Sequence, residues 1–191
     1  MLAEGATEAA AMPAVARRLA ELNPVSYKSL EALGICTVDA GTQSQIADLG
    51  SFYRSLNKVV FAVCDHQTAE GQANIEANVD KLFMHPEAGF EALVLNNAPQ
   101  PAKDRFVASL TWPPHLITKY PDPASDPDNA LMDYFSWSKG NWGISDFLFQ
   151  CTEAEIPQWI RDTLASLREL CDPPPQPPNP VPAEGVATAT S

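Results

Sequence analysis

The sequence predicts an α/β fold in which a mostly parallel sheet is flanked by helices and followed by a helical C-terminal part. Short apolar runs alternate with amphipathic stretches up to residue 98, the pattern after Pro99 is helical, and the end of the chain is rich in proline. We therefore expect an α/β core over residues 1–98, a helical part packed on it over residues 99–171, and a disordered tail over residues 172–191.

Three segments have the composition of buried strands: residues 34–41 (GICTVDAG), 58–65 (KVVFAVCD) and 90–95 (FEALVL). Continuous runs of Val, Ile, Phe and Leu are typical of parallel strands that are covered on both faces. An earlier strand has only the apolar residues Met1 to Ala3 before Glu4, whereas a strand usually has about five or six residues. The first strand is therefore interpreted as cut short, as in a fragment of a longer protein.

Helical periodicity lies between the predicted strands. Residues 7–22 carry apolar side chains near one face, and the same spacing recurs around residues 46–56. After Pro99 the expected helices are roughly 100–111, 128–138, 141–151 and 153–170.

Three local signals accompany the helices of the second half. Thr152 followed by Glu155 has the spacing of a capping box for the last helix. Five prolines between residues 112 and 130 predict a long surface loop there. The seven prolines of residues 172–191 are typical of a polyproline-type segment.

Composition excludes several classes of protein. The chain of 191 residues is 45% hydrophobic, which excludes disorder of the whole, and it lacks an apolar run of the roughly 18 residues that a membrane helix needs. The N-terminus has no secretory signal, so a cytoplasmic location is expected. A net charge of −12 argues against DNA binding through basic side chains alone, so that any contact with DNA would need bound cations.

The four cysteines are widely spaced, without a C-x-x-C pair and without a histidine at zinc-finger distance. We expect Cys36, Cys64, Cys151 and Cys171 to be buried, reduced thiols.

The segment EGATE, residues 4–8, stands at the junction of the short first strand and the first helix. Gly5 permits a tight turn, and Glu4 and Glu8 can converge above the sheet edge where open α/β sheets place their sites. Clustered carboxylates are the ligands that hard divalent cations require. The alternative for Glu8 is a simple interaction with the helix dipole.

Other acids follow predicted strands or begin them. Asp39 and Asp65 end two of the strands and would share one edge of a parallel sheet with Glu4, and Glu91 begins the third strand. Each taken alone has an ordinary alternative as a helix cap or a solvated acid. Lys139 is the natural positive partner, although a lysine at a helix–glycine junction is usually exposed.

Other catalytic patterns are absent. The sequence has neither a G-x-G-x-x-G nor a P-loop segment, and no Ser-His-Asp or Cys-His signature is visible. Of the histidines, His66 is expected on the surface, and His85 and His115, both next to prolines, are expected to be structural or exposed.

The order of these residues resembles a TOPRIM domain, the metal-binding α/β module of topoisomerases, primases and certain nucleases. More specifically, the chain resembles the C-terminal nuclease region of OLD-family ATP-dependent endonucleases over essentially residues 1–171. The segments that carry the resemblance are EGATEAAAMPAVARRLAELNP (4–24), FAVCDHQ (61–67), AGFEALVL (88–95) and WSKGNWGISDFLFQCTEAEIPQWIRDTLASL (137–167).

The resemblance implies a divalent-metal-dependent DNA endonuclease that uses two Mg²⁺ or Mn²⁺ ions to hydrolyse a phosphodiester. Its implied metal ligands are Glu4, Glu8, Asp39, Asp65 and Glu91. Lys139, together with Glu4 and Asp65, would be catalytic, with the lysine next to the scissile phosphate. The implied partners are DNA, an ABC-type ATPase region that normally lies in the same chain, and a second copy in a homodimer.

The sequence departs from the family pattern in two places. Gln67 stands where the second acid of a D-x-D motif is expected, and the ATPase region is absent from these 191 residues. An alternative is therefore a catalytically silent TOPRIM fragment that acts as an interaction or regulatory module. A third reading, RNA cleavage or strand passage, has less support, because none of the four tyrosines has a signature of a nucleophile.

Overall fold

The computed structural model describes residues 1–139 and 142–172. Within this part of the chain, four strands form a sheet in the order β2-β1-β3-β4, and every neighbouring pair is parallel. The strands are β1 (Leu2–Ala3), β2 (Val38–Asp39), β3 (Phe61–Cys64) and β4 (Lys81–Met84). The α/β class with a parallel sheet is thus confirmed, while the predicted tail lies outside the described residues from position 173 onward.

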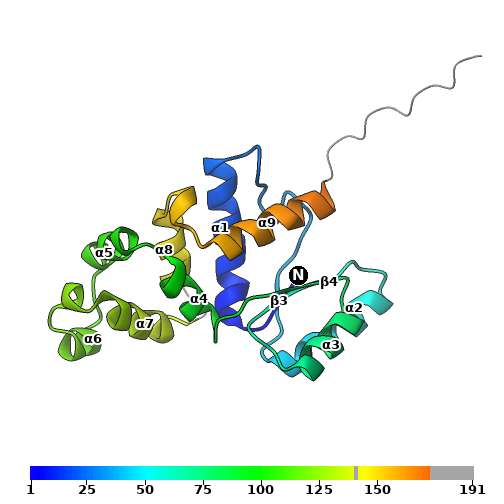
Figure 1. The fold of residues 1–191 in the computed structure, drawn as a ribbon, viewed down its shortest axis with the longest axis horizontal. Coiled ribbons are helices and arrows are strands. Elements are labelled where there is room, and N and C mark those ends of the chain that lie inside the picture. The colour runs from blue at the N-terminus through cyan, green and yellow to red at the C-terminus, as the bar shows by residue number, and fades with distance from the viewer. Residues whose placement is uncertain (140–141, 173–191) are drawn as a thin grey trace, which may run out of the picture.

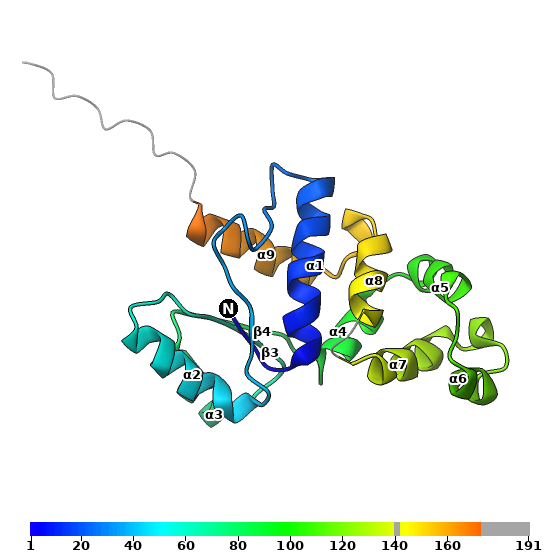
Figure 2. The same cartoon turned by 180° about the vertical axis from the view of Figure 1, so that it is seen from behind.

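Helices cover both faces of the sheet (Figures 1 and 2). The helices α1 (Ala6–Leu22) and α9 (Gln158–Cys171) lie on one side, and α2 (Gln43–Ser55) and α3 (Ala69–Asn78) lie on the other. The central strand β3 alternates between the two layers: Phe61 and Val63 pack in the core with α1 and α9, whereas Ala62 and Cys64 pack in the core with α2 and α3. This period of two is the geometry of a pleated strand.

The part after Pro99 is helical in the described residues, as predicted. Its helices and turns, with the helix that leads into it, are α4 (Phe90–Asn97), α5 (Gln100–Ser109), α6 (Pro114–Lys119), η1 (Pro123–Ser125), α7 (Pro127–Trp137), α8 (Gly143–Gln150) and η2 (Glu153–Glu155). Phe106, Phe135 and Phe147 form an aromatic cluster in which the rings of Phe106 and Phe147 are 5.3 Å apart. One hydrophobic core runs from α1 through these helices, and the domain boundary at residue 98 stays a prediction.

Residues 90–95 form a helix, so their prediction as a strand is wrong. Gly89, with φ of +103°, precedes α4, and Leu93 N donates to the carbonyl of Gly89 over 3.1 Å. A short continuous apolar run has the same appearance in a buried helix as in a buried strand. The strand that follows β3 along the chain is instead β4, at Lys81–Met84, and the sequence pattern did not predict it.

Two further helices were not predicted. Helix α3 buries only Ile75, so its sequence carries little amphipathic signal, but Thr68 caps it by accepting from Gly71 N over 3.1 Å. Helix α6 lies inside the predicted surface loop and starts at Pro114, a position where proline is compatible with a helix. The capping box of Thr152 and Glu155 is present, but it begins the short turn η2 rather than α9.

The prediction of four buried thiols is wrong for two of them. Cys64 and Cys151 are buried, whereas Cys36 lies in the exposed segment before β2 and Cys171 is the exposed last residue of α9. Burial raises the pKa of both buried thiols to about 12, so neither is a thiolate at neutral pH.

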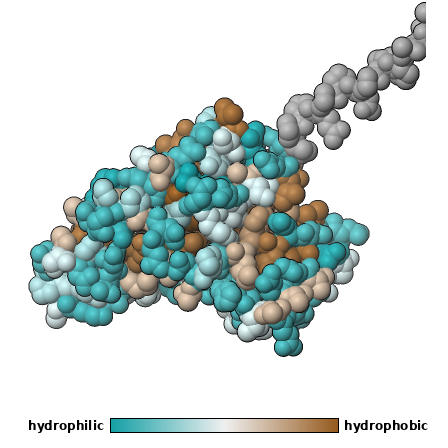
Figure 3. Space-filling view, in the orientation of Figure 1, coloured by the Kyte–Doolittle hydropathy of each residue, from teal (hydrophilic) through white to brown (hydrophobic). Residues whose placement is uncertain are grey.

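No described helix is long and apolar enough to cross a bilayer. The face shown in Figure 3 is largely hydrophilic, and apolar side chains show between the upper helices and the layer of α2 and α3.

Candidate active site

The carboxyl ends of three neighbouring strands place Glu4, Asp39 and Asp65 along one edge of the sheet. Ala3 pairs with Asp39 of β2 and with Val63 of β3. Glu4 directly follows β1 and continues its pairing, because its backbone N donates to the carbonyl of Val63 over 3.1 Å. The shared edge follows from parallel pairing and is the position where open α/β sheets hold ligands.

Glu4, Asp65 and Gln67 form a connected group at this edge. Oε2 of Glu4 accepts from the backbone N of Asp65 at 3.1 Å. The side-chain Nε2 of Gln67 donates to Oδ1 and to the backbone carbonyl of Asp65, both at 3.0 Å, and lies 3.4 Å from Oε2 of Glu4. One amide nitrogen therefore joins the two carboxylates.

Helices α1 and α4 add the next two acids. Glu8 is in the first turn of α1 and is buried, with 7% of its surface exposed. Glu91 is in the first turn of α4, and its Oε1 accepts from the hydroxyl of Thr7 over 3.0 Å. Because residues 90–95 are helical, Glu91 lies at a helix start beside the sheet rather than at the entry of a strand.

A pocket of about 350 Å³ collects these groups. Its charged lining residues are Glu4, Glu8, Asp65, Glu91 and Lys139. Lys139 reaches it from the exposed turn that follows α7. Asp39 does not line the pocket; its exposed carboxylate accepts from Gly41 N over 2.8 Å, the ordinary role of an aspartate in a turn. Its role as a ligand stays a prediction.

Two acids of the pocket, Glu4 and Glu8, have raised pKa values. Burial, followed by the charge of Asp65, raises the pKa of Glu4 from 4.5 to about 7. Burial also raises the pKa of Glu8. The charge of Glu91 raises this pKa further, and the charge of Lys139 lowers it. None of the ion pairs within the described residues involves Glu4, Glu8, Asp65 or Glu91. The pocket therefore holds an excess of negative charge.

The donor set suits a hard divalent cation. Four carboxylates line the pocket, and a cation would offset the burial and the repulsion by Asp65 that raise the pKa of Glu4. Gln67 does not line the pocket; it directs its Nε2 at the two acids, and its buried Oε1 has no hydrogen-bond partner in the described residues. Among residues 1–139 and 142–172, however, no three Asp, Glu, His or Cys side chains already stand close enough to hold an ion. Side chains must therefore move for the pocket to bind one.

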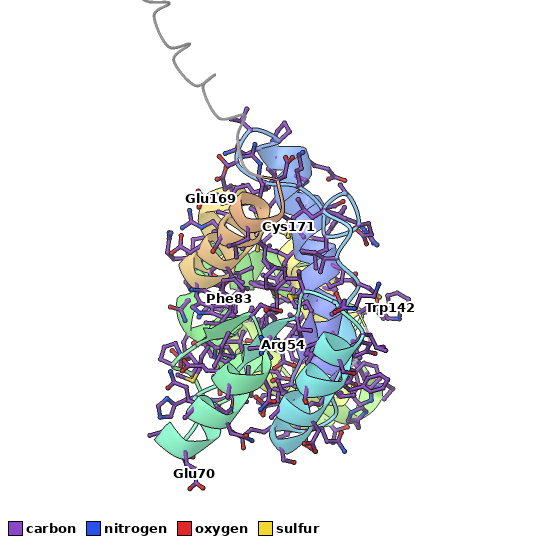
Figure 4. All side chains as sticks on the ribbon, turned by 90° about the vertical axis from the view of Figure 1, so that its right-hand side faces the viewer. Arg54, Glu70, Phe83, Trp142, Glu169 and Cys171 are labelled. Carbon is purple, nitrogen blue, oxygen red and sulfur yellow. The ribbon has the colours of Figure 1, made fainter. Side chains whose placement is uncertain are left out.

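A larger pocket of about 640 Å³ lies at the opposite edge of the sheet, and it lacks this chemistry. It lies between the end of α9, where Cys171 is labelled in Figure 4, and the end of α2. Its lining is largely apolar, with Lys58 as its charged side chain and no carboxylate among the described residues.

Sequence reasoning did not identify Thr7 as a member of the site. It is buried, with 6% of its surface exposed, and it fixes the carboxylate of Glu91. Its place between Glu4 and Glu8 in the EGATE segment was the available signal. His66 is exposed as expected, and His85 is completely buried against Trp159, with the ring centroids 5.2 Å apart.

Comparison with known proteins agrees with this arrangement. Residues 1–66, which contain β1 through β3 and both Glu4 and Asp65, match the family model described as "Overcoming lysogenization defect protein-like, TOPRIM domain". This segment is a TOPRIM domain of the OLD family. No curated protein matches the sequence.

Two solved structures share the fold of the TOPRIM segment and of the helices that follow it. One is the C-terminal region of the Burkholderia pseudomallei OLD protein, with a TM-score of 0.61 and 14% identity over 89% of this chain and 96% of that one. The other is the C-terminal region of the Xanthomonas campestris pv. campestris OLD protein, with a TM-score of 0.60 and 18% identity over 89% of this chain and 91% of that one. The fold class with the TOPRIM core is thereby confirmed.

Proposed function

We propose that this chain is a divalent-metal-dependent DNA endonuclease that hydrolyses phosphodiester bonds with two Mg²⁺ or Mn²⁺ ions. The observation that carries the proposal is the pocket at the carboxyl edge of the sheet, where Glu4, Glu8, Asp65 and Glu91 face one cavity with Lys139. A TOPRIM fold at residues 1–66 supports a nuclease-type module. Hydrolysis of a phosphodiester needs ligands for the cations and a positive group for the phosphate. The acidic residues supply the first, and the lysine supplies the second.

Glu4 and Asp65 are the proposed ligands on the sheet, and Glu8 and Glu91 the proposed ligands on helices. When bound, the cations supply Lewis acidity that activates water and stabilises the leaving oxygen. The strand pairing fixes the backbone at Glu4, whose Oε2 accepts from the backbone N of Asp65, and the hydroxyl of Thr7 orients Glu91 over 3.0 Å. Asp39 lies at the same edge outside the pocket and is proposed only as an outer member of this set.

Lys139 is proposed to act on the phosphate. It lines the pocket together with the four acids and is exposed, which leaves it accessible to a bound strand. A fixed positive charge next to the phosphate stabilises the negative charge that develops as water attacks. The chain has a net charge of −12, so cations bound at the pocket would also have to offset its repulsion of the DNA phosphates.

The chain is further proposed to act as the nuclease portion of a larger OLD-family enzyme. Both similar structures are described as C-terminal regions of OLD proteins. An ABC-type ATPase region and a second copy in a homodimer are the proposed partners, and the cytoplasm is the proposed location.

A catalytically silent interaction module is the second candidate. It is favoured by the position of Gln67, whose amide already bridges Glu4 and Asp65, and by the lack of a preformed three-residue metal cluster in the described residues. Such a module would retain the fold and would not respond to Mg²⁺ or Mn²⁺.

Nicking of supercoiled plasmid by the purified chain distinguishes the two candidates. We expect nicking with Mn²⁺ or Mg²⁺, none with EDTA, and none by a Glu4→Gln variant whose circular dichroism matches the wild type. The matched control is Glu70→Gln, which makes the same change at an exposed glutamate that Figure 4 labels at the start of α3. Equal nicking by Glu4→Gln and wild type would refute the proposed site, and a folded wild type that never nicks would favour the silent module.

A further inference from the structure

Two of the four tryptophans are exposed, and they stand on either side of Lys139 in the sequence. Trp142 is 75% exposed and Trp137 is 55% exposed. The other two, Trp112 and Trp159, are half-buried, and each donates its ring N–H to a backbone carbonyl over 3.2 Å. Tryptophan is highly buried on average, so two exposed rings beside one lysine require an explanation.

The backbone brings both rings to the place where Lys139 lines the acidic pocket. Ser138 and Gly143 lie against each other, because a Cβ on Gly143 would overlap Oγ of Ser138. Trp137 directly precedes Ser138, Lys139 directly follows it, and Trp142 directly precedes Gly143. Trp137, Lys139 and Trp142 therefore form one surface patch, called the aromatic patch below.

The rings of the aromatic patch are available to a ligand. Trp137 packs on Tyr134, with the ring centroids 5.8 Å apart, and on His115, with the ring centroids 5.7 Å apart. These contacts hold its orientation while more than half of its surface stays open. Trp142 lies at the margin of the molecule, beside α1 (Figure 4). A ring whose orientation is already held loses little conformational entropy when a ligand stacks on it.

The chemistry of the aromatic patch fits an unpaired nucleobase. A base stacks on an aromatic ring through its flat face, which is free in a single strand and covered by neighbouring base pairs in a duplex. Lys139 adds a positive charge for the phosphates that join the bases. The net charge of −12 limits what phosphate contacts alone can contribute to affinity, whereas stacking on an uncharged ring is free of that limit.

We propose that Trp137 and Trp142 stack unpaired bases of a DNA strand and so present that strand to Lys139 and the acidic pocket. The inference rests on the proposed function and deepens it, because it names unpaired DNA as the form of the substrate. Every stacked base carries its phosphodiester with it, so a strand held at the aromatic patch has a phosphate next to Lys139. The two tryptophans thereby gain a role that neither the core nor the proposed metal ligands give them.

Binding of a short fluorescent oligothymidine, measured by anisotropy with Mg²⁺, tests the inference. The parent protein is Glu4→Gln, in which we expect no cleavage of the strand. The comparison probes are a strand with the same phosphates but no bases, and a blunt duplex of the same length. The variants added to the parent are Trp142→Ala, Trp142→Phe and Trp137→Ala. The matched control is Phe52→Ala, at an exposed ring of α2 that does not line the pocket.

We expect the parent to bind the oligothymidine more tightly than the baseless strand or the duplex. Trp142→Ala should weaken binding of the oligothymidine about 5- to 150-fold, the range for the loss of one stacked base, and should leave binding of the baseless strand unchanged. Trp137→Ala should act in the same direction, Trp142→Phe should keep most of the affinity, and Phe52→Ala should match the parent. A parent without a preference for the strand that has bases, or a Trp142→Ala variant that keeps this preference in full, would overturn the inference.

Tryptophan emission gives a second readout, one that a purely structural role would not change. A base stacked on Trp142 should quench its emission, so the oligothymidine should quench the parent more strongly than it quenches Trp142→Phe. Unchanged affinity in Trp142→Ala together with a smaller sedimentation coefficient would overturn the inference and assign the ring to a contact between copies of this chain. Plasmid nicking reports separately on the proposed function. A wild type that never nicks, with a preference for bases that depends on Trp142, would refute hydrolysis and leave the stacking site standing.

Discussion

The backbone N of Asp65 donates to Oε2 of Glu4 over 3.1 Å, which links the residue after β3 to the residue after β1. This bond favours the charged form of Glu4, yet burial and the charge of Asp65 outweigh it and raise the pKa of Glu4 to about 7. Without a cation, the pair therefore holds a proton over much of the range below neutral pH. That proton is the competitor of any metal ion at this edge.

Mn²⁺ affinity should consequently depend on pH. Because the pKa of Glu4 is about 7, a cation that binds its carboxylate must displace a proton at pH 5.5 and none at pH 8. We expect affinity to rise up to about tenfold per pH unit below pH 7 and to level off above it. Calorimetry in two buffers of different ionisation enthalpy measures the proton release directly, and a pH-independent affinity with no proton release would contradict this account.

Glu4 should also make the stability of the cation-free fold depend on pH. This stability should fall as pH rises, whereas Mn²⁺ affinity should increase. The pKa of Glu4 is raised from 4.5 to about 7 in the folded chain, so the folded state binds the proton more tightly than the unfolded state. The stabilising contribution is present in full below pH 4.5 and is lost as pH rises through 7. Melting temperatures of wild type should fall between pH 5 and 8 by more than those of Glu4→Gln. Parallel curves for the two proteins would show that Glu4 titrates normally.

Lys139→Ala should separate chemistry from cation binding. Removing a group that stabilises charge in the transition state costs about 10²- to 10³-fold in rate, whereas a cation site made of carboxylates should lose no affinity when a neighbouring positive charge is removed. The measurement is single-turnover cleavage of labelled DNA beside Mn²⁺ titration. Lys58→Ala, at the exposed lysine of the opposite pocket, is the control. A Lys139→Ala enzyme that cleaves at the wild-type rate would remove this residue from the mechanism.

Gly50→Ala tests the packing of the layer beneath the site. Gly50 is buried in α2, and a Cβ there would lie 2.6 Å from the carbonyl oxygen of Asn78 at the end of α3. Alanine normally stabilises a helix relative to glycine by about 1 kcal/mol, but here we expect overpacking to destabilise the chain by about 1–3 kcal/mol. Ser51→Ala, at the exposed next position, should be neutral or slightly stabilising. Urea denaturation measures both, and a stabilised Gly50→Ala would show that α2 and α3 can separate.

The position of Glu4 and Asp65 could be predicted because it follows from strand topology. An acid at the end of a short apolar run reaches the carboxyl edge of a parallel sheet, and the pairing of β1 with β3 places both there. Asp39 follows the same rule and shares the edge, but its carboxylate is used in the turn at Gly41. Strand topology therefore predicts an edge, and only the loop conformation decides which side chain enters the pocket.

Glu91 and Gln67 show what the sequence pattern lacks. Glu91 enters the pocket because residues 90–97 form a helix after Gly89, and the apolar run FEALVL does not distinguish that helix from a strand. Gln67 is a residue type that is mostly exposed, so nothing local predicts that it is buried between two acids. Both positions depend on contacts between segments more than twenty residues apart.

The most direct test of the central claim is anomalous scattering from a crystal of the chain grown with Mn²⁺ and a short DNA duplex. We expect manganese in the pocket within coordination distance, about 2.0–2.6 Å, of the carboxylates of Glu4 and Asp65, with a phosphate beside Lys139. Manganese found only elsewhere on the chain, or DNA bound away from this edge of the sheet, would contradict it.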